Sequence, residues 1–302
     1  MARRGAQYSC KDLFEDLKSS LDKGVHEMAR SIFRSLRLSD KDLDFLVETA
    51  SPGVIDKPKL KQILKEDEKF RNTFIDDEKV FRKLMGEEEM FLRISPALFF
   101  EILLRRVARD LKEVGYTIEK TGTSKVPVFD TKNIAEFLSK EYLLGYLANM
   151  LSSFTRIETY AFNLQIGNHI FEKIRFNDLD VVSLKALCDE VGDEYRLGFY
   201  KRIADICLFI LGIFPDYAEY DYRYPFSGQL RPQFRGKVRM GAEVYEKEGR
   251  KFYKLAAEHP SARELDLSDV FWTLHEDFPK AKKPLNFIAE HYLRYKRYRF
   301  FG

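Results

Sequence analysis

Apolar residues recur at helical spacing through the first third of the chain, in short segments rich in charge. The apolar positions are Leu13, Leu17 and Leu21 in residues 12–23, and Val25, Met28, Ile32 and Leu36 in residues 25–36. Ser39 followed by Asp42 resembles a helix-capping pair with Asp in place of Glu. The pattern predicts an N-terminal region, residues 1–92, of charged amphipathic helices.

The pattern changes near residue 95, where more apolar segments begin. Ser95-Pro96 predicts a capped helix over 96–114, and further helices are predicted over 131–152 and 193–214. The last of these should be the central helix of a larger helical domain, residues 93–302, with Leu208 and Ile210 fully buried. Its apolar run is about 12 residues long, whereas a membrane span needs roughly 20, so no membrane partner is expected.

Two segments depart from helical spacing. Residues 116–129 alternate polar and β-branched positions, which indicates a loop or a small β-hairpin. Residues 155–175 fit either a helix or two short strands around Gly167-Asn168. The predicted fold class is all-α, a multi-helix globular bundle with a small β-hairpin near 116–129 as an optional element.

Composition sets the protein class. The 302 residues are 45% hydrophobic and 14% aromatic, which is enough for a substantial core. Lys and Arg number 51 against 48 Asp and Glu, so any nucleic-acid role must be local. The charged fraction of 33%, with few Asn and Gln, resembles the composition of thermophile proteins. Three cysteines at 10, 188 and 207, and no apolar signal-peptide core after Arg4, favour a cytoplasmic protein.

Catalytic and metal-binding motifs are missing from the sequence. The histidines, at 26, 169, 259, 275 and 291, do not have metal-ligand spacing, and the cysteines form no C-x-x-C pair. The glycine-rich and nucleophile motifs of nucleotide-binding enzymes and hydrolases are also missing. We therefore expect no cofactor and no metal, while an unfamiliar active site stays open.

A basic, aromatic loop at 222–242 is the strongest functional signal. No acidic residue occurs in this stretch, and its prolines and glycines break any regular period. Cations and aromatic rings that interleave there can hold a phosphate-bearing partner or an acidic protein surface. The candidate binding residues are Arg223, Arg231, Phe234, Arg235, Lys237 and Arg239.

Three polar residues interrupt the most apolar segments: Glu101, Asn149 and Asp205. An unpaired buried charge costs several kcal/mol, so each carboxylate should be paired, Asp205 with Lys201 or Arg202 for instance. One interpretation is a set of ion pairs beside the core. The other is a polar pocket between helices, with perturbed carboxylates that bind a ligand or exchange protons.

The C-terminal segment, residues 291–302, alternates Arg and Lys with Tyr and Phe. Its cations could cap a helix end, or the segment could join the loop in one basic, aromatic surface. Three hypotheses follow. The first is a non-enzymatic helical binding or scaffold protein that engages its partner, a protein or a nucleic acid, through the loop. The second is a nucleic-acid-binding accessory protein that uses the loop and the C-terminal segment. The third is an enzyme with its site at Glu101, Asn149 and Asp205.

Overall fold

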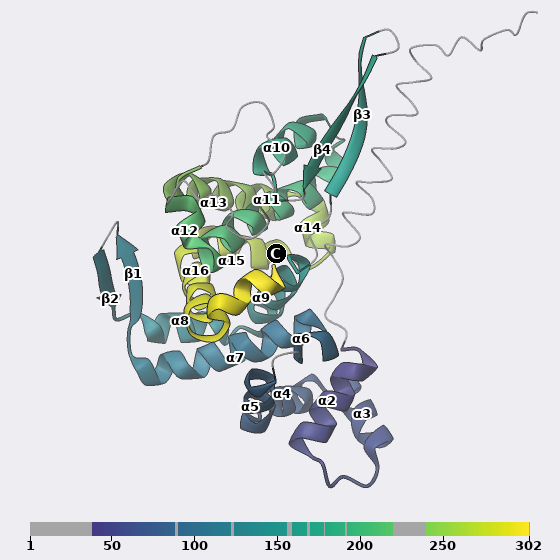
Figure 1. The fold of residues 1–302 in the computed structure, drawn as a ribbon, viewed down its shortest axis with the longest axis vertical. Helices are drawn as coiled ribbons and strands as arrows, with labels where there is room; N and C mark the ends of the chain where they lie inside the picture. Colours follow the sequence, from purple (N-terminus) through teal and green to yellow (C-terminus); the bar gives the residue numbers. More distant parts are fainter. Residues whose placement is uncertain are drawn as a thin grey trace, which may run out of the picture.

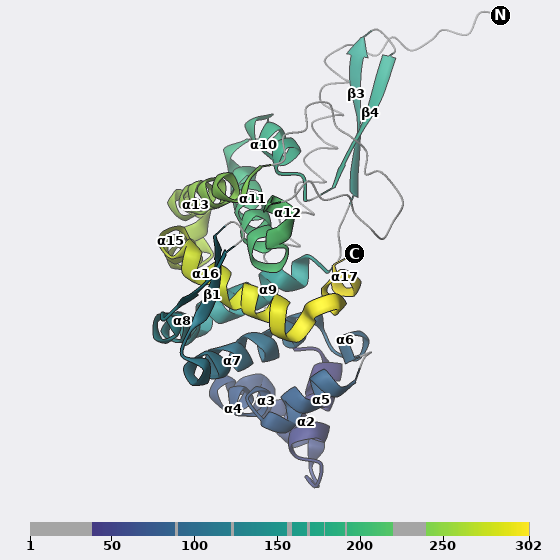
Figure 2. The ribbon, with the colours of Figure 1, turned by 60° about the vertical axis from the view of Figure 1, so that its left-hand side comes forward.

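The computed structural model describes residues 38–87, 90–121, 124–155, 159–167, 170–177, 179–190, 192–219 and 240–301. Most of these residues are helical, which confirms the predicted helical architecture. The first helices are α2 (Asp40–Ala50), α3 (Lys57–Glu66), α4 (Glu68–Ile75), α5 (Glu78–Gly86) and α6 (Met90–Arg93). They gather beside α7 (Pro96–Val114), as Figures 1 and 2 show.

The larger part of the helical body follows. It contains α8 (Thr131–Leu138), α9 (Glu141–Ser153), α10 (Val181–Glu190), α11 (Asp193–Ile213), α12 (Pro215–Glu219) and α13 (Ala242–Glu258). After these come α14 (Pro260–Glu264), α15 (Ser268–Glu276) and α16 (Phe278–Phe287). The chain continues through a π-helix η1 (Ile288–Leu293), a 3-10 turn η2 (Arg294–Lys296) and α17 (Arg297–Phe300).

Local capping starts the helices where the sequence predicts. Ser39 and Asp42 form a capping box at α2, because the Ser39 hydroxyl accepts from Asp42 N and the Asp42 carboxylate accepts from Ser39 N. The hydroxyl of Ser95 caps α7 with Pro96 at the first helical position. Asp42 Oδ1 also accepts from Ser95 N at 2.6 Å, so one carboxylate ties the start of α2 to the start of α7.

Helix α11 is the centre of the fold, as predicted. Between Leu197 and Ile213 every residue except Tyr200 is buried. Leu208 is completely buried and Ile210 is 8% exposed. Helices α10, α13 and α16 pack against α11, while α8 and α9 pack against α7. A helix covered on nearly all sides needs apolar residues around its whole circumference, which explains the apolar run of its sequence.

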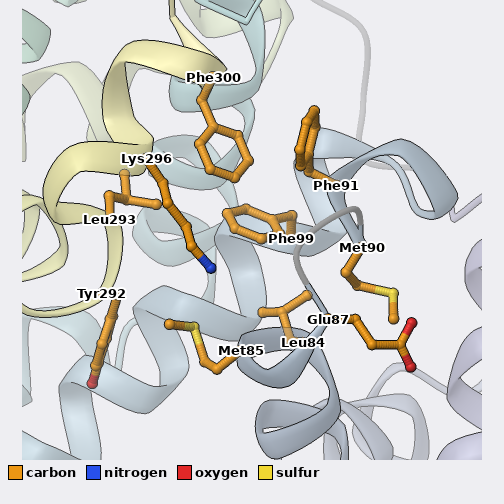
Figure 3. A pocket seen from close by; sticks show the side chains of 10 residues that line it. All are labelled: Leu84, Met85, Glu87, Met90, Phe91, Phe99, Tyr292, Leu293, Lys296 and Phe300. Atoms are coloured by element: carbon orange, nitrogen blue, oxygen red, sulfur yellow. The ribbon is translucent and has the colours of Figure 1, made fainter.

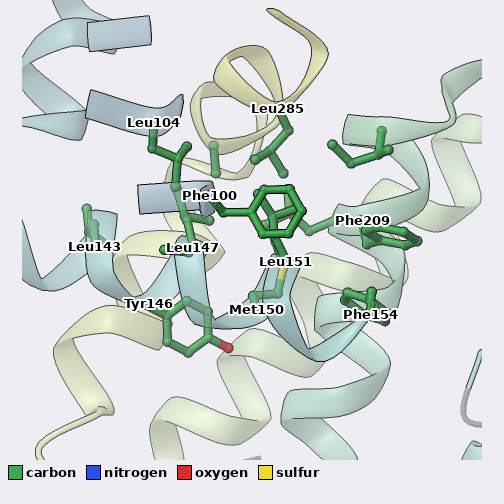
Figure 4. Packing of buried hydrophobic residues seen from close by; sticks show 14 of the residues in the cluster. Phe100, Leu104, Leu143, Tyr146, Leu147, Met150, Leu151, Phe154, Phe209 and Leu285 are labelled. Atoms are coloured by element: carbon green, nitrogen blue, oxygen red, sulfur yellow. The ribbon is translucent and has the colours of Figure 1, made fainter. Parts of the chain in front are cut away.

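One apolar cluster runs through these helices. In Figure 4, Phe100 of α7, Leu147 and Leu151 of α9, Phe209 of α11 and Leu285 of α16 meet side by side. The cluster also includes Phe45, Ile75 and Val80 of the first helices, and a second small cluster joins Leu43, Val47 and Leu64.

Two antiparallel hairpins complete the described chain. Strands β1 (Thr117–Thr121) and β2 (Ser124–Val128) pair from Thr117↔Val128 to Thr121↔Ser124. Strands β3 (Thr159–Gly167) and β4 (Ile170–Asn177) pair from Thr159↔Asn177 to Gly167↔Ile170 and project from the helical body in both views (Figures 1 and 2). The sequence left residues 155–175 open between helix and strand, and the structure has strands there. The alternation of aromatic and β-branched residues with polar ones suits a strand.

None of the helices in the described ranges combines the length and the apolar composition that a membrane span requires.

Candidate functional site

Asp205 lies at the junction of α9, α11 and α13. Its Oδ2 accepts from Lys201 Nζ at 2.6 Å, one turn earlier on α11. Its Oδ1 accepts from the hydroxyl of Tyr146 on α9 at 2.6 Å and from that of Tyr253 on α13 at 2.8 Å. The predicted pairing of Asp205 with a local cation is confirmed. The two tyrosine donors join three helices through one carboxylate.

This cluster of Lys201, Asp205, Tyr146 and Tyr253 is closed to solvent. Asp205 is 0% exposed and Lys201 is 5% exposed. Burial, with the charge of Asp205, raises the pKa of Tyr146 and of Tyr253 well above the usual 10.0. Burial lowers the pKa of Lys201, and Asp205 opposes that change. The tyrosines therefore remain protonated donors at neutral pH, and both carboxylate oxygens of Asp205 accept hydrogen bonds.

Glu101 belongs to a different polar cluster, centred on Arg105 of α7. Arg105 Nε donates to Glu101 Oε1 at 3.1 Å, and its Nη2 lies 2.5 Å from Glu141 Oε2 on α9. Arg105 Nη1 lies 3.5 Å from Asp76 Oδ2, just after α4. Burial raises the pKa of Glu101, and the adjacent Arg105 charge counters this rise. Arg105 thus connects α7 to α9 and to the first helices.

The structure does not bring Glu101 and Asp205 to a common partner among the described residues. Asn149, on α9 three residues after Tyr146, is partly exposed. Sequence reasoning predicted the local ion pairs of both carboxylates. It missed Tyr253, which bonds to Asp205 from 48 residues away, and Glu141, which bonds to Arg105 from 36 residues away, because both come from other helices.

The six candidate binding residues of the basic loop, Arg223, Arg231, Phe234, Arg235, Lys237 and Arg239, lie outside the described residues. The flanks of the loop are described. Tyr217 and Ala218, before the loop, and Met240 and Ala242, at its end, are partly buried against the core. Helix α12, which precedes the loop, packs against α13, which follows it. The described residues on the two sides of the loop therefore lie on two neighbouring helices.

The C-terminal segment packs its phenylalanines inward. Phe301 is 6% exposed and stacks on Phe100 with ring centroids 5.6 Å apart, while Phe300 lies 4.8 Å from Phe99. Arg297 donates to the Ile213 carbonyl at 3.1 Å. These side chains therefore stabilise the fold. Fewer aromatic rings of this segment are then free to stack on nucleic-acid bases.

An apolar pocket lies between α5, α6, α7 and the C-terminal segment, and Figure 3 shows its walls. Its volume is 20 Å³, enough for about one water molecule or one small apolar group. The pocket is lined by Leu84, Met85, Glu87, Met90, Phe91, Phe99, Tyr292, Leu293, Lys296 and Phe300. The amine of Lys296 points between Tyr292 and Phe99 toward Met85 (Figure 3).

Backbone strain occurs beside this pocket. The π-helix η1 ends at Leu293, and Arg294 has φ 39° and ψ −116°, a conformation that suits glycine. Such a residue costs on the order of 1–3 kcal/mol, and both π-helices and strained residues are frequent at functional sites. Sequence reasoning missed the pocket, since its walls come from residues 84–99 and 292–300.

Comparisons of the chain with protein-family models, curated proteins and solved structures found no match to any of them. Within the described part of the chain, no group of three or more His, Cys, Asp or Glu side chains is placed to hold a metal ion.

Proposed function

We propose that this chain is a non-enzymatic helical binding or scaffold protein that captures an acidic protein surface through the loop at 222–242. One observation carries the proposal: α12 and α13 pack against each other, yet a connection of about 20 residues joins them. Adjacent helices need only a few linking residues. A longer connection is therefore unnecessary for packing these two helices, and long connections in compact domains are mostly functional loops or linkers.

The chemistry of the loop supports an acidic partner. Five cations without an acid between them create a local positive potential in a chain whose overall charge is only +3. Arg and aromatic residues are also the residue types that dominate binding energy at protein interfaces. The buried, mutually bonded state of the Glu101 and Asp205 clusters supports a binding role over catalysis. Two buried free cysteines, Cys188 and Cys207, fit a reducing, cytoplasmic location.

Charge reversal in the loop tests the proposal directly. The variant Arg231→Glu/Arg235→Glu is used as bait in an extract at low salt, and the recovered partner is quantified against wild type. Its matched control is Lys112→Glu/Lys132→Glu, which changes two exposed cations and the net charge by the same amount elsewhere. We expect the loop variant to lose its partner, the control to keep it, and both to unfold at nearly the wild-type temperature.

Nuclease treatment separates the two kinds of partner. Recovery of a protein partner is unchanged by nuclease, whereas a nucleic-acid partner is no longer recovered. Binding of a nucleic-acid partner also weakens as the salt concentration rises. Equal recovery by the loop variant and wild type would remove the loop as the main binding surface. A large loss of thermal stability in the loop variant would instead make Arg231 and Arg235 internal ion-pair partners.

A further inference from the structure

We propose that strand β3 pairs antiparallel with β3 of a second copy of this chain, so that the two β3–β4 hairpins join in one sheet. The strand order of this sheet is β4-β3-β3-β4, and a two-fold axis lies between the two β3 strands. The inference is independent of the basic loop, because it concerns another part of the chain.

The β3–β4 hairpin has open edges. Among the described strands, β3 and β4 pair only with each other, so each has one edge without a partner there. The hairpin projects from the helical body in both views (Figures 1 and 2). A two-stranded hairpin by itself is only marginally stable in water, and an open edge presents a row of unpaired N–H and C=O groups. A further strand at one edge would therefore stabilise the hairpin.

The sequence of β3 lacks the residues that keep a strand edge from pairing. Proteins protect open edges with charged residues and prolines. The other three described strands have such residues: Glu119 and Lys120 in β1, Lys125 and Pro127 in β2, and Glu172, Lys173 and Arg175 in β4. Strand β3, with the sequence TYAFNLQIG, has neither a charge nor a proline. Of the described strands, β3 is therefore the one whose edge is suited to pairing.

Charge also excludes β4 as the strand that pairs with its own copy. Residues opposite each other in an antiparallel pair share one face, so a two-fold axis places one residue opposite its own copy. With the axis at Glu172, Lys173 or Arg175, two identical charges stand opposite each other. With the axis at Ile174, Lys173 stands opposite Arg175 of the second copy. Like charges in opposite positions destabilise a sheet, so the two-fold pairing belongs to β3.

Strand β3 is complementary to its own copy about Phe162. The register of β3 with β4 is regular over residues 159–165, so an undistorted part of the strand extends on both sides of Phe162. With the axis there, Phe162 stands opposite its copy, and Tyr160 stands opposite Leu164 of the second copy. Aromatic and apolar cross-strand pairs stabilise a sheet. The match of the strand with itself favours a second copy of this chain as the occupant of the edge.

Glutamates on β3 test the pairing in the full-length protein. In the hairpin, Ala161 stands opposite Arg175 and Asn163 opposite Lys173, so Ala161→Glu/Asn163→Glu places acids opposite the cations of β4. With the axis at residue 161, 162 or 163, the same acids stand opposite acids of the second copy. We expect the wild type to sediment as a dimer in analytical ultracentrifugation. The dimer dissociation constant of the variant should be about 10-fold higher or more, because like-charge pairs replace uncharged ones.

A variant of opposite charge separates pairing from folding. Ala161→Lys/Asn163→Lys should also dimerise weakly by itself. Mixed in equal amounts with the glutamate variant, it should form a heterodimer, because cations then stand opposite acids across the interface. Thr73→Glu/Asn133→Glu is the matched control for the glutamate variant, since it adds two acids at exposed positions of α4 and α8. The control should dimerise as the wild type does.

Three results would overturn the proposal. They are a wild type that stays monomeric through the micromolar range, a glutamate variant that dimerises as tightly as the wild type, and charge-reversed variants that form no heterodimer. The first result would leave the edge of β3 to another protein, and the second would place the contact between copies elsewhere. Hydrogen exchange of the wild type needs no variant. The β3 amides should exchange faster when the protein is diluted below the dissociation constant, and an unchanged rate would contradict the pairing.

Discussion

Replacing Asp205 by Asn removes a fully buried charge while it keeps the shape of the side chain. Lys201, 5% exposed, then has no counter-charge at 2.6 Å. Removing one partner of a buried ion pair costs about 3–5 kcal/mol. The Tyr146 and Tyr253 hydroxyls keep an oxygen at the same position and lose only the charge-assisted part of their bonds. We therefore expect Asp205→Asn to lower the free energy of unfolding by about 3–5 kcal/mol.

A double-mutant cycle isolates the ion pair from the rest of the cluster. Lys201→Met leaves a buried carboxylate with two hydroxyl donors, whereas Lys201→Met/Asp205→Asn leaves no buried charge. The free energy of unfolding lost in the double variant should be smaller than the sum of the losses in the two single variants, by about 2 kcal/mol or more. Urea unfolding followed by the fluorescence of Trp272, the only tryptophan, measures all four proteins.

Asp193→Asn is the matched control on the same helix. The Asp193 carboxylate lies 2.8 Å from Arg196 but is 86% exposed, and exposed ion pairs contribute at most about 1 kcal/mol. Two results would contradict a stabilising role of the ion pair. In one, Asp205→Asn lowers the free energy of unfolding no more than this control does. In the other, the losses of free energy in the two single variants add up to the loss in the double variant.

Four further predictions concern the fold. Leu208→Ala should cost about 2–5 kcal/mol in urea unfolding through the cavity it leaves, and a loss below about 1 kcal/mol would contradict the central place of α11. Gly249→Ala should cost about 1–3 kcal/mol in the same assay, because a Cβ there would lie 2.5 Å from the Phe278 ring; unchanged stability would show that the ring moves freely. Arg294→Gly should raise the thermal midpoint by relieving the positive φ, and a fall would mean that the Arg294 side chain contributes more than the strain costs. Above pH 10.0 the folded protein keeps the Tyr253 proton, whereas the unfolded chain loses it, because burial raises the pKa of Tyr253. Tyr253 therefore lowers the free energy of unfolding by about 1.4 kcal/mol for each pH unit above 10.0. Tyr253→Phe should flatten that fall in urea titrations between pH 10 and 11, and an unchanged slope would refute the assignment.

The sequence by itself determined the features that depend on neighbours along the chain. Helical spacing of apolar residues located α7 and α11, and Ser39 and Ser95 marked two helix starts, because caps and amphipathic periods act within a few residues. It also predicted that Asp205 pairs with a nearby cation, Lys201 or Arg202, since residues three or four apart meet on one helix face, and the structure shows the pair with Lys201. The choice between helix and strands at residues 155–175 stayed open, because a short alternating run is compatible with both periods.

The tertiary structure alone decided which helix faces meet. Tyr146 and Tyr253 reach the same carboxylate from positions 59 and 48 residues away, and no local pattern encodes that meeting. One of the two interpretations of the C-terminal sequence placed Phe300 and Phe301 in a basic, aromatic surface, whereas the structure packs them against Phe99 and Phe100. The pocket likewise forms only where α5, α6 and α7 meet the C-terminal segment. Burial in a helical protein is a property of the packed assembly, so the exposure of an aromatic side chain follows from the segments that cover it.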